Sequence, residues 1–394
     1  MVAALRVTLG LLSLLLATAV WLPCLHLFFT PRLTDYARPA GLAPEARALA
    51  ARHFALWENP PSRAAELQRM RITNAEWDFM GRTFLVLALA NIAGREPAET
   101  PRCLAVIDTI IDETIRLEQS EGMYYFMMGY ARAGTWVARP ARSVFIDGEI
   151  ALMLGARLLV ANQPAYRPLL KERVETMMAQ MRQSPVLCAE SYPDECWLFC
   201  NTVALAATRI HDVVSGEDHA AFLREWVQTA KQKLVHPPTG LLMSSFTVDG
   251  QHIIDGPEGS SIWMAAHCLL IVDPRFARDQ YARARHELAG GCLGFGYARE
   301  WPATFRGPAD VDSGPIIPVL DISAGSSGLA FVGASAFGDE AYLRSLLASL
   351  NLGGFPTTKH GTLRYCASNQ VGDAVLLYAL TFGPLWEKAR PAQR

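Results

Sequence analysis

The chain has 394 residues, of which 51% are hydrophobic and 19% are charged. A composition this apolar excludes a disordered chain. The formal net charge of -2 provides no basic excess to neutralise a nucleic-acid backbone. The length exceeds that of an ordinary single core, so the chain forms either two domains or one closed, repetitive architecture. We therefore expect a small molecule or a membrane, and not nucleic acid, as the partner.

The first predicted element is a membrane segment. Residues 7–29 carry no formal charge, and a helix of that length, at ~1.5 Å per residue, spans the ~30 Å hydrocarbon layer. We expect residues 1–32 to form an uncleaved, single-pass anchor. The alternative is a cleaved signal peptide with Ala17-Thr18-Ala19 as its A-x-A site. The numbers of basic residues before and after the segment are nearly equal. By analogy with signal anchors, we expect the rest of the chain on the extracytoplasmic, periplasmic side.

Helix-period patterns dominate the rest of the chain, and strand-like alternation is scarce. Residues 33–73 are predicted to form a connecting helical segment, and residues 74–390 a single domain. Within that domain an apolar helix is followed six times by a more charged, amphipathic helix. The predicted pairs are 77–92 with 101–119, 144–160 with 165–182, 197–213 with 218–234, 261–271 with 274–288, 328–336 with 339–350, and 371–382 with 384–389.

Six such hairpins predict an all-α fold, an (α/α)6 toroid in which the apolar helices form the inner wall of a barrel. A closed ring buries one extended core, which accounts for the length without a second domain. An open solenoid is the alternative, but its repeats would be similar in length and sequence, whereas the spacing here is irregular. Long loops precede the inner helices, and we expect these loops to gather at one end of the barrel.

Polar side chains in or beside these loops are the candidates for binding a substrate. They are Asp147, Tyr192, Asp194, Trp197, Glu258, Asp310 and Asp312. Asp310 and Asp312 are two residues apart, so in an extended segment both carboxylates point to one side, an arrangement that suits acid/base chemistry or a metal. The structural alternatives are an Asx turn for this pair and helix N-caps for Asp194, Ser260 and Asn369.

Glu149 differs from these residues because it lies inside an apolar run near the start of a predicted inner helix. Burial of an unpaired carboxylate there would raise its pKa. A carboxyl group held protonated in this way can serve as a general acid. Pairing with Arg142 or Arg157 is the structural alternative.

The eight cysteines do not form a disulfide scaffold in a chain of this length. Cys196 and Cys200 share a helix face and Cys188 lies upstream, but they lack the C-x-x-C element and partnered His of a zinc site. We therefore expect buried thiols and no metal. The H-E-x-x-H, G-x-S-x-G, P-loop and dinucleotide signatures are absent from the sequence, so no cofactor is predicted.

One stretch is recognisable. Pro193-Asp194-Glu195-Cys196-Trp197-Leu198-Phe199-Cys200-Asn201-Thr202-Val203-Ala204 resembles the P-D-x-x-x-x-x-C-N-[ST]-V-A segment of the linalool dehydratase/isomerase family. Further agreement lies in the G-x-x-x-L-M-x-G helix that begins at Gly148, in Asp273-Pro274-x-Phe276 and in Leu363-Arg364-Tyr365. The resemblance extends in the same order over most of Asn74 to Leu380.

The resemblance implies an (α/α)6 barrel and a cofactor-free enzyme that dehydrates and isomerises monoterpene alkenols. The family's chemistry is assigned to an Asp, a Tyr, a His and a pair of Cys around an apolar pocket. Cys200 matches the second family cysteine, and Cys188 corresponds to the first with a gap of a few residues. Asp78 corresponds to the family's Asp. Where the family's catalytic His precedes L-x-L-M, this sequence has Glu149.

We therefore expect a membrane-anchored lyase or isomerase that acts on a small, apolar, terpenoid-type alkenol, with Glu149, Cys200, Asp78 and Cys188 as catalytic residues. Two alternatives stay open. One is a glycan-active (α/α)6 hydrolase or lyase with paired carboxylates, since fold alone does not decide function. The other is a non-catalytic, membrane-tethered binding scaffold. The expected partners are a small-molecule substrate and, through the N-terminal helix, membrane lipid; a homo-oligomer is left open.

Overall fold

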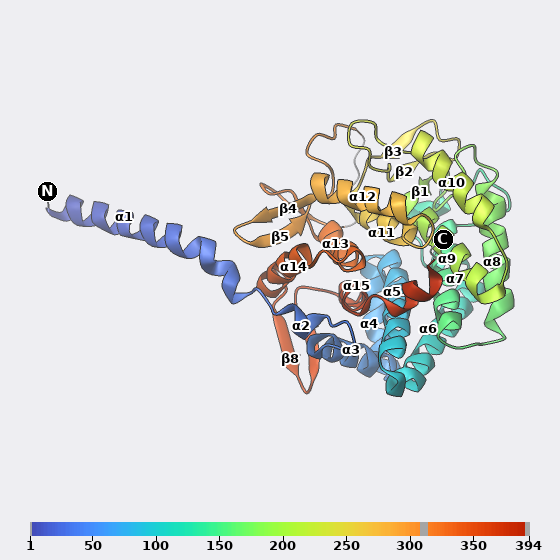
Figure 1. The fold of residues 1–394 in the computed structure, drawn as a ribbon, viewed down its shortest axis with the longest axis horizontal. Helices are drawn as coiled ribbons and strands as arrows, with labels where there is room; N and C mark the ends of the chain where they lie inside the picture. Colours follow the sequence, from blue (N-terminus) through green and yellow to red (C-terminus); the bar gives the residue numbers. More distant parts are fainter. Residues whose placement is uncertain (1, 308–313, 391–394) are drawn as a thin grey trace.

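The computed structural model of the chain describes residues 2–307 and 314–390. Six apolar helices form the inner wall of a ring (Figure 1). They are α5 (Ala75–Arg95), α7 (Val144–Val160), α9 (Leu198–Ser215), α11 (Gly259–Leu269), α13 (Ala324–Phe337) and α15 (Gln370–Thr381). Each packs against the next, and α15 packs against α5, which closes the ring. The predicted (α/α)6 toroid is confirmed.

Five amphipathic helices cover the outside of this ring. They are α6 (Thr100–Glu121), α8 (Tyr166–Met181), α10 (Ala220–Lys233), α12 (Pro274–Glu287) and α14 (Glu340–Gly353). On α6, for example, Ile107, Ile110 and Ile111 are fully buried while Glu121 is exposed, so one stripe of the helix faces the core. Because an outer helix returns the chain after each inner helix, all six inner helices begin at the same end of the barrel.

The sixth outer position differs from the predicted pairing. The short helix α16 (Pro384–Ala389) contacts α5, α7 and α9, and Trp386 stacks on His267 at a ring-centroid distance of 4.5 Å. It therefore closes the far end of the barrel. The outer layer beside α15 and α5 is instead supplied by α3 (Pro44–Trp57) and α4 (Pro60–Thr73). A helix of six residues is too short to cover an inner helix twice its length, and the segment predicted as a connection has a packing role.

The loops at the other end carry short antiparallel strands and 3-10 turns. A three-stranded sheet joins β1 (Cys196–Trp197), β2 (Ser245–Phe246) and β3 (Ile253–Asp255), and hairpins pair β4 (Ala289–Cys292) with β5 (Phe295–Ala298), β6 (Ile316–Ile317) with β7 (Ile322–Ser323), and β8 (Pro356–Lys359) with β9 (Thr362–Tyr365). The 3-10 turns at this end are η3 (Met123–Tyr125) and η4 (Gly129–Arg132), whereas η2 (Pro97–Glu99) joins α5 to α6 at the far end of the barrel. These elements give the loops fixed positions over the inner helices.

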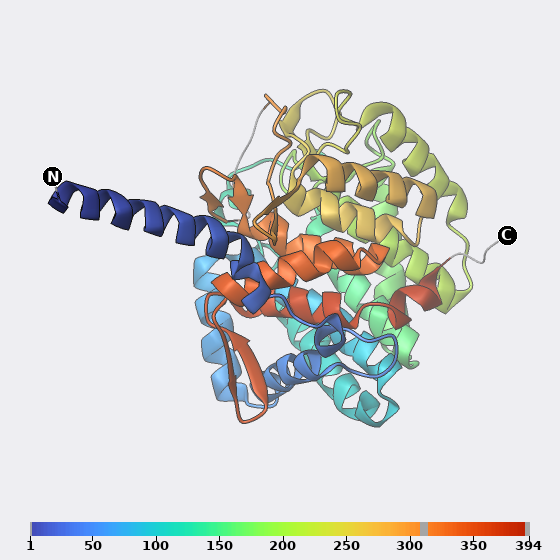
Figure 2. The same ribbon diagram turned by 60° about the vertical axis from the view of Figure 1, so that its left-hand side comes forward.

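The N-terminal helix α1 (Val2–Trp21) projects from the body, and η1 (Leu22–Phe28) and α2 (Leu33–Tyr36) connect it to the barrel (Figure 2). The apolar stretch from Ala3 to Tyr36 is long enough to cross a membrane, with a mean hydropathy of 2.0 in its most apolar window, and that window makes no buried contacts with the barrel. A signal sequence has the same properties.

Candidate active site

A cavity of about 320 Å³ lies at the end of the barrel where the inner helices begin. Every inner helix contributes to its wall, as do the loops above them. Side chains of Asn74, Ser143, Ser323 and Asn369 cap α5, α7, α13 and α15 by accepting hydrogen bonds from first-turn N–H groups. Asn369 is thus the N-cap that the structural alternative predicted. Because six helix N-termini converge here, their partial positive charges favour anionic groups at the cavity.

Most of the cavity wall is apolar. Large side chains of Trp77, Met80, Phe145, Phe199 and Leu329 line it. Glycines of α13 and α15 also line the wall, and their lack of side chains leaves space open there. Among the described lining residues there is no Lys or Arg, and the carboxylates are Glu76 and Glu258. The chemistry available to a ligand therefore rests on a few polar groups in an apolar chamber.

Glu76, in the first turn of α5, is held by a tyrosine. The Tyr192 hydroxyl donates to Glu76 Oε1 and accepts from the Met128 N–H at 2.9 Å. The Tyr192 ring stacks on Tyr130 with a centroid distance of 4.8 Å. Both tyrosines line the cavity. The hydrogen bond from the Tyr192 hydroxyl stabilises the charged form of Glu76. The stacking of the two rings fixes the direction of that hydroxyl.

Glu258 immediately precedes α11 and is buried. Its Oε2 accepts from the Ser261 hydroxyl at 3.2 Å, and its backbone N–H donates to Ser244 Oγ at 2.8 Å. In the ring of six inner helices α11 is three positions from α5. Glu258 and Glu76 therefore occupy opposite walls of the cavity, and a ligand between them can meet one carboxyl group on each side.

Cys200, in the first turn of α9, also lines the cavity. Burial raises the pKa of its thiol well above the usual value, a contact with Ser191 opposes this, and the charges of Glu149 and Glu76 add to the rise. The thiol is therefore protonated at neutral pH. It presents a neutral, polarizable S–H group to a ligand.

Glu149 lies one helical turn after the cavity-lining Phe145, deeper in the barrel. Its side chain is buried and, among the described residues, forms no ion pair; Oε2 has no hydrogen-bond partner. Burial raises its pKa to about 8, and a weaker interaction with the Thr83 hydroxyl opposes that rise. Arg142 pairs with Asp147, and Arg157 pairs with Asp108. Neither candidate arginine neutralises Glu149, so this carboxyl is protonated at neutral pH.

Asp78 and Asp147 do not reach the cavity. Asp78 Oδ1 accepts from Arg82 Nε at 2.9 Å, deep between α5 and α6. Asp147 belongs to a buried network with Glu118, Arg142 and Arg173. Asp78 pairs with Arg82 on the same helix, and Arg82 in turn pairs with Glu113 of α6, whereas Asp147 pairs directly with Arg173 of the outer helix α8. The structure therefore does not give them the catalytic and substrate-binding positions that we expected.

Two other predicted residues also lie away from the cavity wall. Cys188 is a fully buried thiol whose pKa is raised by burial, and its carbonyl accepts from Cys196 Sγ at 3.6 Å. Asp194, at a φ of +57°, accepts from the Val248 N–H at 3.1 Å and so fastens a loop. Trp197 does line the cavity, and its indole N–H donates to Glu195 at 3.2 Å.

Asp310 and Asp312 lie outside the described residues. Of the predicted set, the structure thus brings Cys200, Tyr192, Trp197 and Glu258 to one cavity. It places Glu149 below them, and keeps Asp78, Asp147, Cys188 and Asp194 in structural contacts.

Among the cavity residues that the sequence prediction missed is the carboxylate Glu76, although it stands two positions before Asp78. Residues two apart on a helix point about 200° away from each other. The arginine four positions after Asp78 marks that side of the helix as the ion-paired one. Helical phase would therefore have assigned the cavity side to Glu76 and Met80, four residues apart.

Comparison with known proteins identifies one family. A family model described as linalool dehydratase/isomerase matches residues 162–371, which is just over half of the chain. The matched segment includes Tyr192, Cys200 and Glu258, and it begins after α5 and α7, which carry Glu76 and Glu149.

Two solved structures are similar in overall arrangement. One is a GH76 α-mannanase from Bacteroides thetaiotaomicron, with 11% sequence identity, a TM-score of 0.47, and coverage of 78% of this chain and 86% of that one. The other is a GH76A α-1,6-mannanase from Salegentibacter sp. HEL1_6, with 12% identity, a TM-score of 0.47, and coverage of 78% and 88%.

Proposed function

Since the chain belongs to the linalool dehydratase/isomerase family, we propose that it is a cofactor-free enzyme that dehydrates or isomerises a small, apolar, terpenoid-type alkenol. The observation that carries this proposal is an apolar cavity with carboxyl groups on opposite walls, Glu76 and Glu258. A volume of about 320 Å³ lies at the small end of the roughly 300–1,000 Å³ range of small-molecule sites. A compact hydrocarbon with one hydroxyl group suits such a chamber.

Loss of water from an alkenol needs an acid at the hydroxyl oxygen and a base at a neighbouring carbon. We assign Glu258 as the acid and Glu76, which the Tyr192 hydroxyl stabilises in its charged form, as the base. Glu258 gives a proton to the hydroxyl, the C–O bond breaks, and water leaves. Glu76 takes a proton from the neighbouring carbon, and that C–H electron pair forms the new double bond. Proton exchange with water restores both groups.

Cys200 has a supporting role in this scheme. Its neutral thiol lies on the α9 wall, between the two carboxyl-bearing walls in the ring. We assign it a hydrogen bond to the substrate hydroxyl, since a protonated thiol is a weak donor. The converging helix N-termini oppose a free carbocation, so we expect proton loss and C–O cleavage to be concerted.

The test is a substrate panel offered to the full-length protein in detergent, with products identified by gas chromatography. The panel contains allylic alcohols of five to fifteen carbons and, for the glycan alternative, aryl α- and β-glycosides. We expect turnover of the alcohols. Glu258→Gln and Glu76→Gln should each lower kcat/KM at least ~100-fold, the usual scale of a lost acid or base. Cys200→Ala should lower it less.

Glu175→Gln is the matched control, because this side chain is 60% exposed on the outer helix α8 and should change nothing. Unchanged alcohol turnover in both cavity variants would contradict the assignment of acid and base. The glycan alternative retains one favourable observation, since Trp77, Trp197 and Tyr130 place aromatic rings beside the two carboxyl groups. Turnover of the glycosides and not of the alcohols would support it.

We also propose that α1 remains attached and anchors the enzyme in a membrane, with the barrel on the extracytoplasmic side. Large exposed apolar side chains lie in the elements beside the anchor: Leu293, Ile317, Val319, Leu352 and Phe355. These elements also contact the segment after α1. The rings of Phe295 and His26 are 6.2 Å apart, and Asn351 donates to the Phe29 carbonyl at 3.1 Å.

This apolar rim includes the β6–β7 hairpin, whose flanking residues Pro315 and Ala324 line the cavity. A rim of this composition favours contact with lipid over contact with water. An apolar alcohol dissolved in the bilayer would then have a short route into the cavity. The proposed location and the proposed substrate class therefore support each other.

A further inference from the structure

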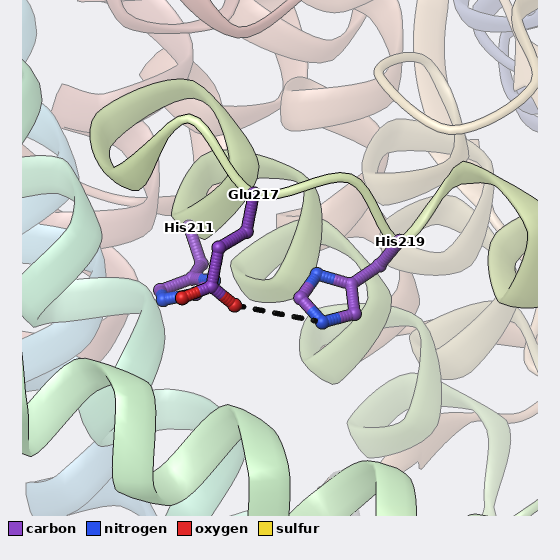
Figure 3. A group of neighbouring side chains, drawn as sticks. All are labelled: His211, Glu217 and His219. Atoms are coloured by element: carbon purple, nitrogen blue, oxygen red, sulfur yellow. Dashed lines mark ion pairs between the residues drawn. The ribbon is translucent and has the colours of Figure 1, made fainter.

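A second cluster of chemically capable side chains lies at the opposite end of α9 from the cavity. His211 is near the end of α9, Glu217 is in the following turn, and His219 immediately precedes α10 (Figure 3). One donor atom from each side chain lies within 4.8 Å of the other two. Glu217 Oε2 and His219 Nε2 are 4.0 Å apart.

The backbone brings these three residues together. Gly216 ends α9 at a φ of +83°, and its N–H donates to the Asp212 carbonyl at 2.9 Å. Glycine takes this left-handed conformation without steric cost. The chain reverses there, so Glu217 and His219 fold back beside the last turns of α9. The reversal of the chain at Gly216 is therefore what brings the three side chains together.

Asp212 fixes the orientation of one imidazole. Its Oδ1 is 2.5 Å from His219 Nδ1, and its Oδ2 accepts from the His219 backbone N–H at 3.1 Å. In the neutral ring the Nδ1 proton is donated to this carboxylate, which leaves the lone pair of Nε2 directed toward Glu217. A carboxylate behind one nitrogen and a metal at the other is the usual arrangement of a metal-binding histidine.

His211 presents an unexplained buried nitrogen. Its side chain is 2% exposed, and Nδ1 has no hydrogen-bond partner among the described residues. A buried polar atom without a partner is costly and calls for a cause.

We propose that His211, Glu217 and His219 bind a divalent transition-metal ion, with the ligand chemistry of zinc. Two imidazoles and a carboxylate are a common zinc set, completed by water as the fourth ligand. Bonds of ~2.0–2.1 Å in a tetrahedron need donor atoms about 3.4 Å apart, so the ligands must move inward by about 1 Å. Glu217 is partly exposed and lies in a turn, where such a shift is least costly.

Lys171 is the group that competes with the metal. Its ammonium donates to Glu217 Oε1 at 2.7 Å, which leaves Oε2 facing the imidazoles. The lysine side chain is 49% exposed, so solvent screens its charge. His211 is eleven residues after Cys200, about 16 Å along the helix. The ion therefore fastens the α9–α10 turn and takes no part in chemistry at the cavity.

The experiment uses full-length protein in detergent, stripped with a chelator and titrated with Zn²⁺ and, separately, with Co²⁺. We expect one ion per chain and a rise in Tm that Mg²⁺ does not reproduce. Glu217→Gln keeps the shape of the site and should weaken Zn²⁺ binding at least tenfold, as should His219→Ala. Lys171→Met should tighten it, because a competing charge is removed. His286→Ala is the control, since this histidine is 85% exposed and outside the cluster.

The Co²⁺ spectrum separates this site from the cysteines. Visible d–d bands without a thiolate charge-transfer band are expected for nitrogen and oxygen ligands. A thiolate band, or Zn²⁺ binding that Glu217→Gln and His219→Ala leave unchanged, would overturn the proposal. So would the absence of any bound Zn²⁺ in the unsubstituted protein. Because Glu217 and His219 are partly exposed, their variants should fold even where His211→Ala does not.

Discussion

Burial by itself does not identify a catalytic carboxyl group in this protein. Asp78, Asp147 and Glu149 are all buried on inner helices. Two of them face arginines, whose charge compensates for the loss of water. Glu149 has no such ion pair among the described residues, so it avoids the cost by staying protonated. Whether a buried carboxyl group is charged is therefore decided by an arginine beside it, and not by how deeply it is buried.

Glu149 should make stability depend on pH. Its pKa is about 8 in the folded chain against an ordinary 4.5. Below pH ~4.5 both folded and unfolded chains hold the proton. Between that pH and ~8 the unfolded chain releases the proton and the folded chain keeps it, so folded-state stability falls as pH rises, by on the order of 5 kcal/mol in total.

Glu149→Gln removes this titration. The Tm of the variant relative to the unsubstituted protein should therefore increase from pH 5 to pH 8 and level off above it, as measured by scanning calorimetry in detergent. Glu175→Gln, an exposed substitution of the same type, should give a flat difference. A flat difference for Glu149→Gln as well would show that the carboxyl is not held protonated.

At the scale of elements, the inner helices are apolar nearly all round because each is covered on every side. Small residues decide how closely they approach. A Cβ at Gly155 of α7 would lie 2.6 Å from Ile210 Cγ2 of α9, whereas a Cβ at Gly148 would meet atoms of α9 at 3.5 Å or more. The first distance is a clash and the second an ordinary contact, although both glycines lie on the same helix.

The two glycines should therefore respond to alanine with opposite signs. Gly148→Ala should stabilise the chain by up to about 1 kcal/mol, because alanine is the better helix former. Gly155→Ala should destabilise it, since ~1–3 kcal/mol of overpacking outweighs that gain. Denaturant unfolding of both variants measures the difference. Equal effects would mean that α7 and α9 are not packed as closely at Gly155 as described.

At the scale of the whole molecule, one closed ring is joined to one apolar helix that has no contacts with the ring's core. Figures 1 and 2 both show α1 extending away from the barrel. Its leucines and valines are exposed, and in water such a surface would be unstable. The helix must therefore either lie in a membrane or be cleaved from the chain.

Intact mass and N-terminal sequencing of protein extracted from membranes distinguish the two outcomes. We expect a chain that retains Arg6 and partitions with the membrane fraction after a high-salt wash, because apolar burial is not screened by salt. A mature chain that begins near Val20, in the soluble fraction, would establish a cleaved signal peptide. Replacing Ala17 and Ala19 by Leu is the matched control, since it blocks cleavage and leaves the span apolar.

The sequence by itself determined the ring and the apolar N-terminal helix. An apolar inner helix is followed by an amphipathic outer helix five times among the described residues, and this periodicity is local enough to be recognised in the chain. It also provided Cys200, Tyr192, Trp197 and Glu258 as cavity residues, because they stand in loops or first turns at the start of inner helices.

Only the tertiary structure decided which acidic groups face an arginine on another element. Asp147, for example, pairs with Arg173, which lies twenty-six residues later in the chain on α8. It also decided that α16 closes the barrel end while α3 and α4 complete the outer layer. These outcomes depend on contacts between distant segments, and no local pattern of hydrophobic residues encodes them. The free energy of burying a charge is fixed by whatever the fold places beside it.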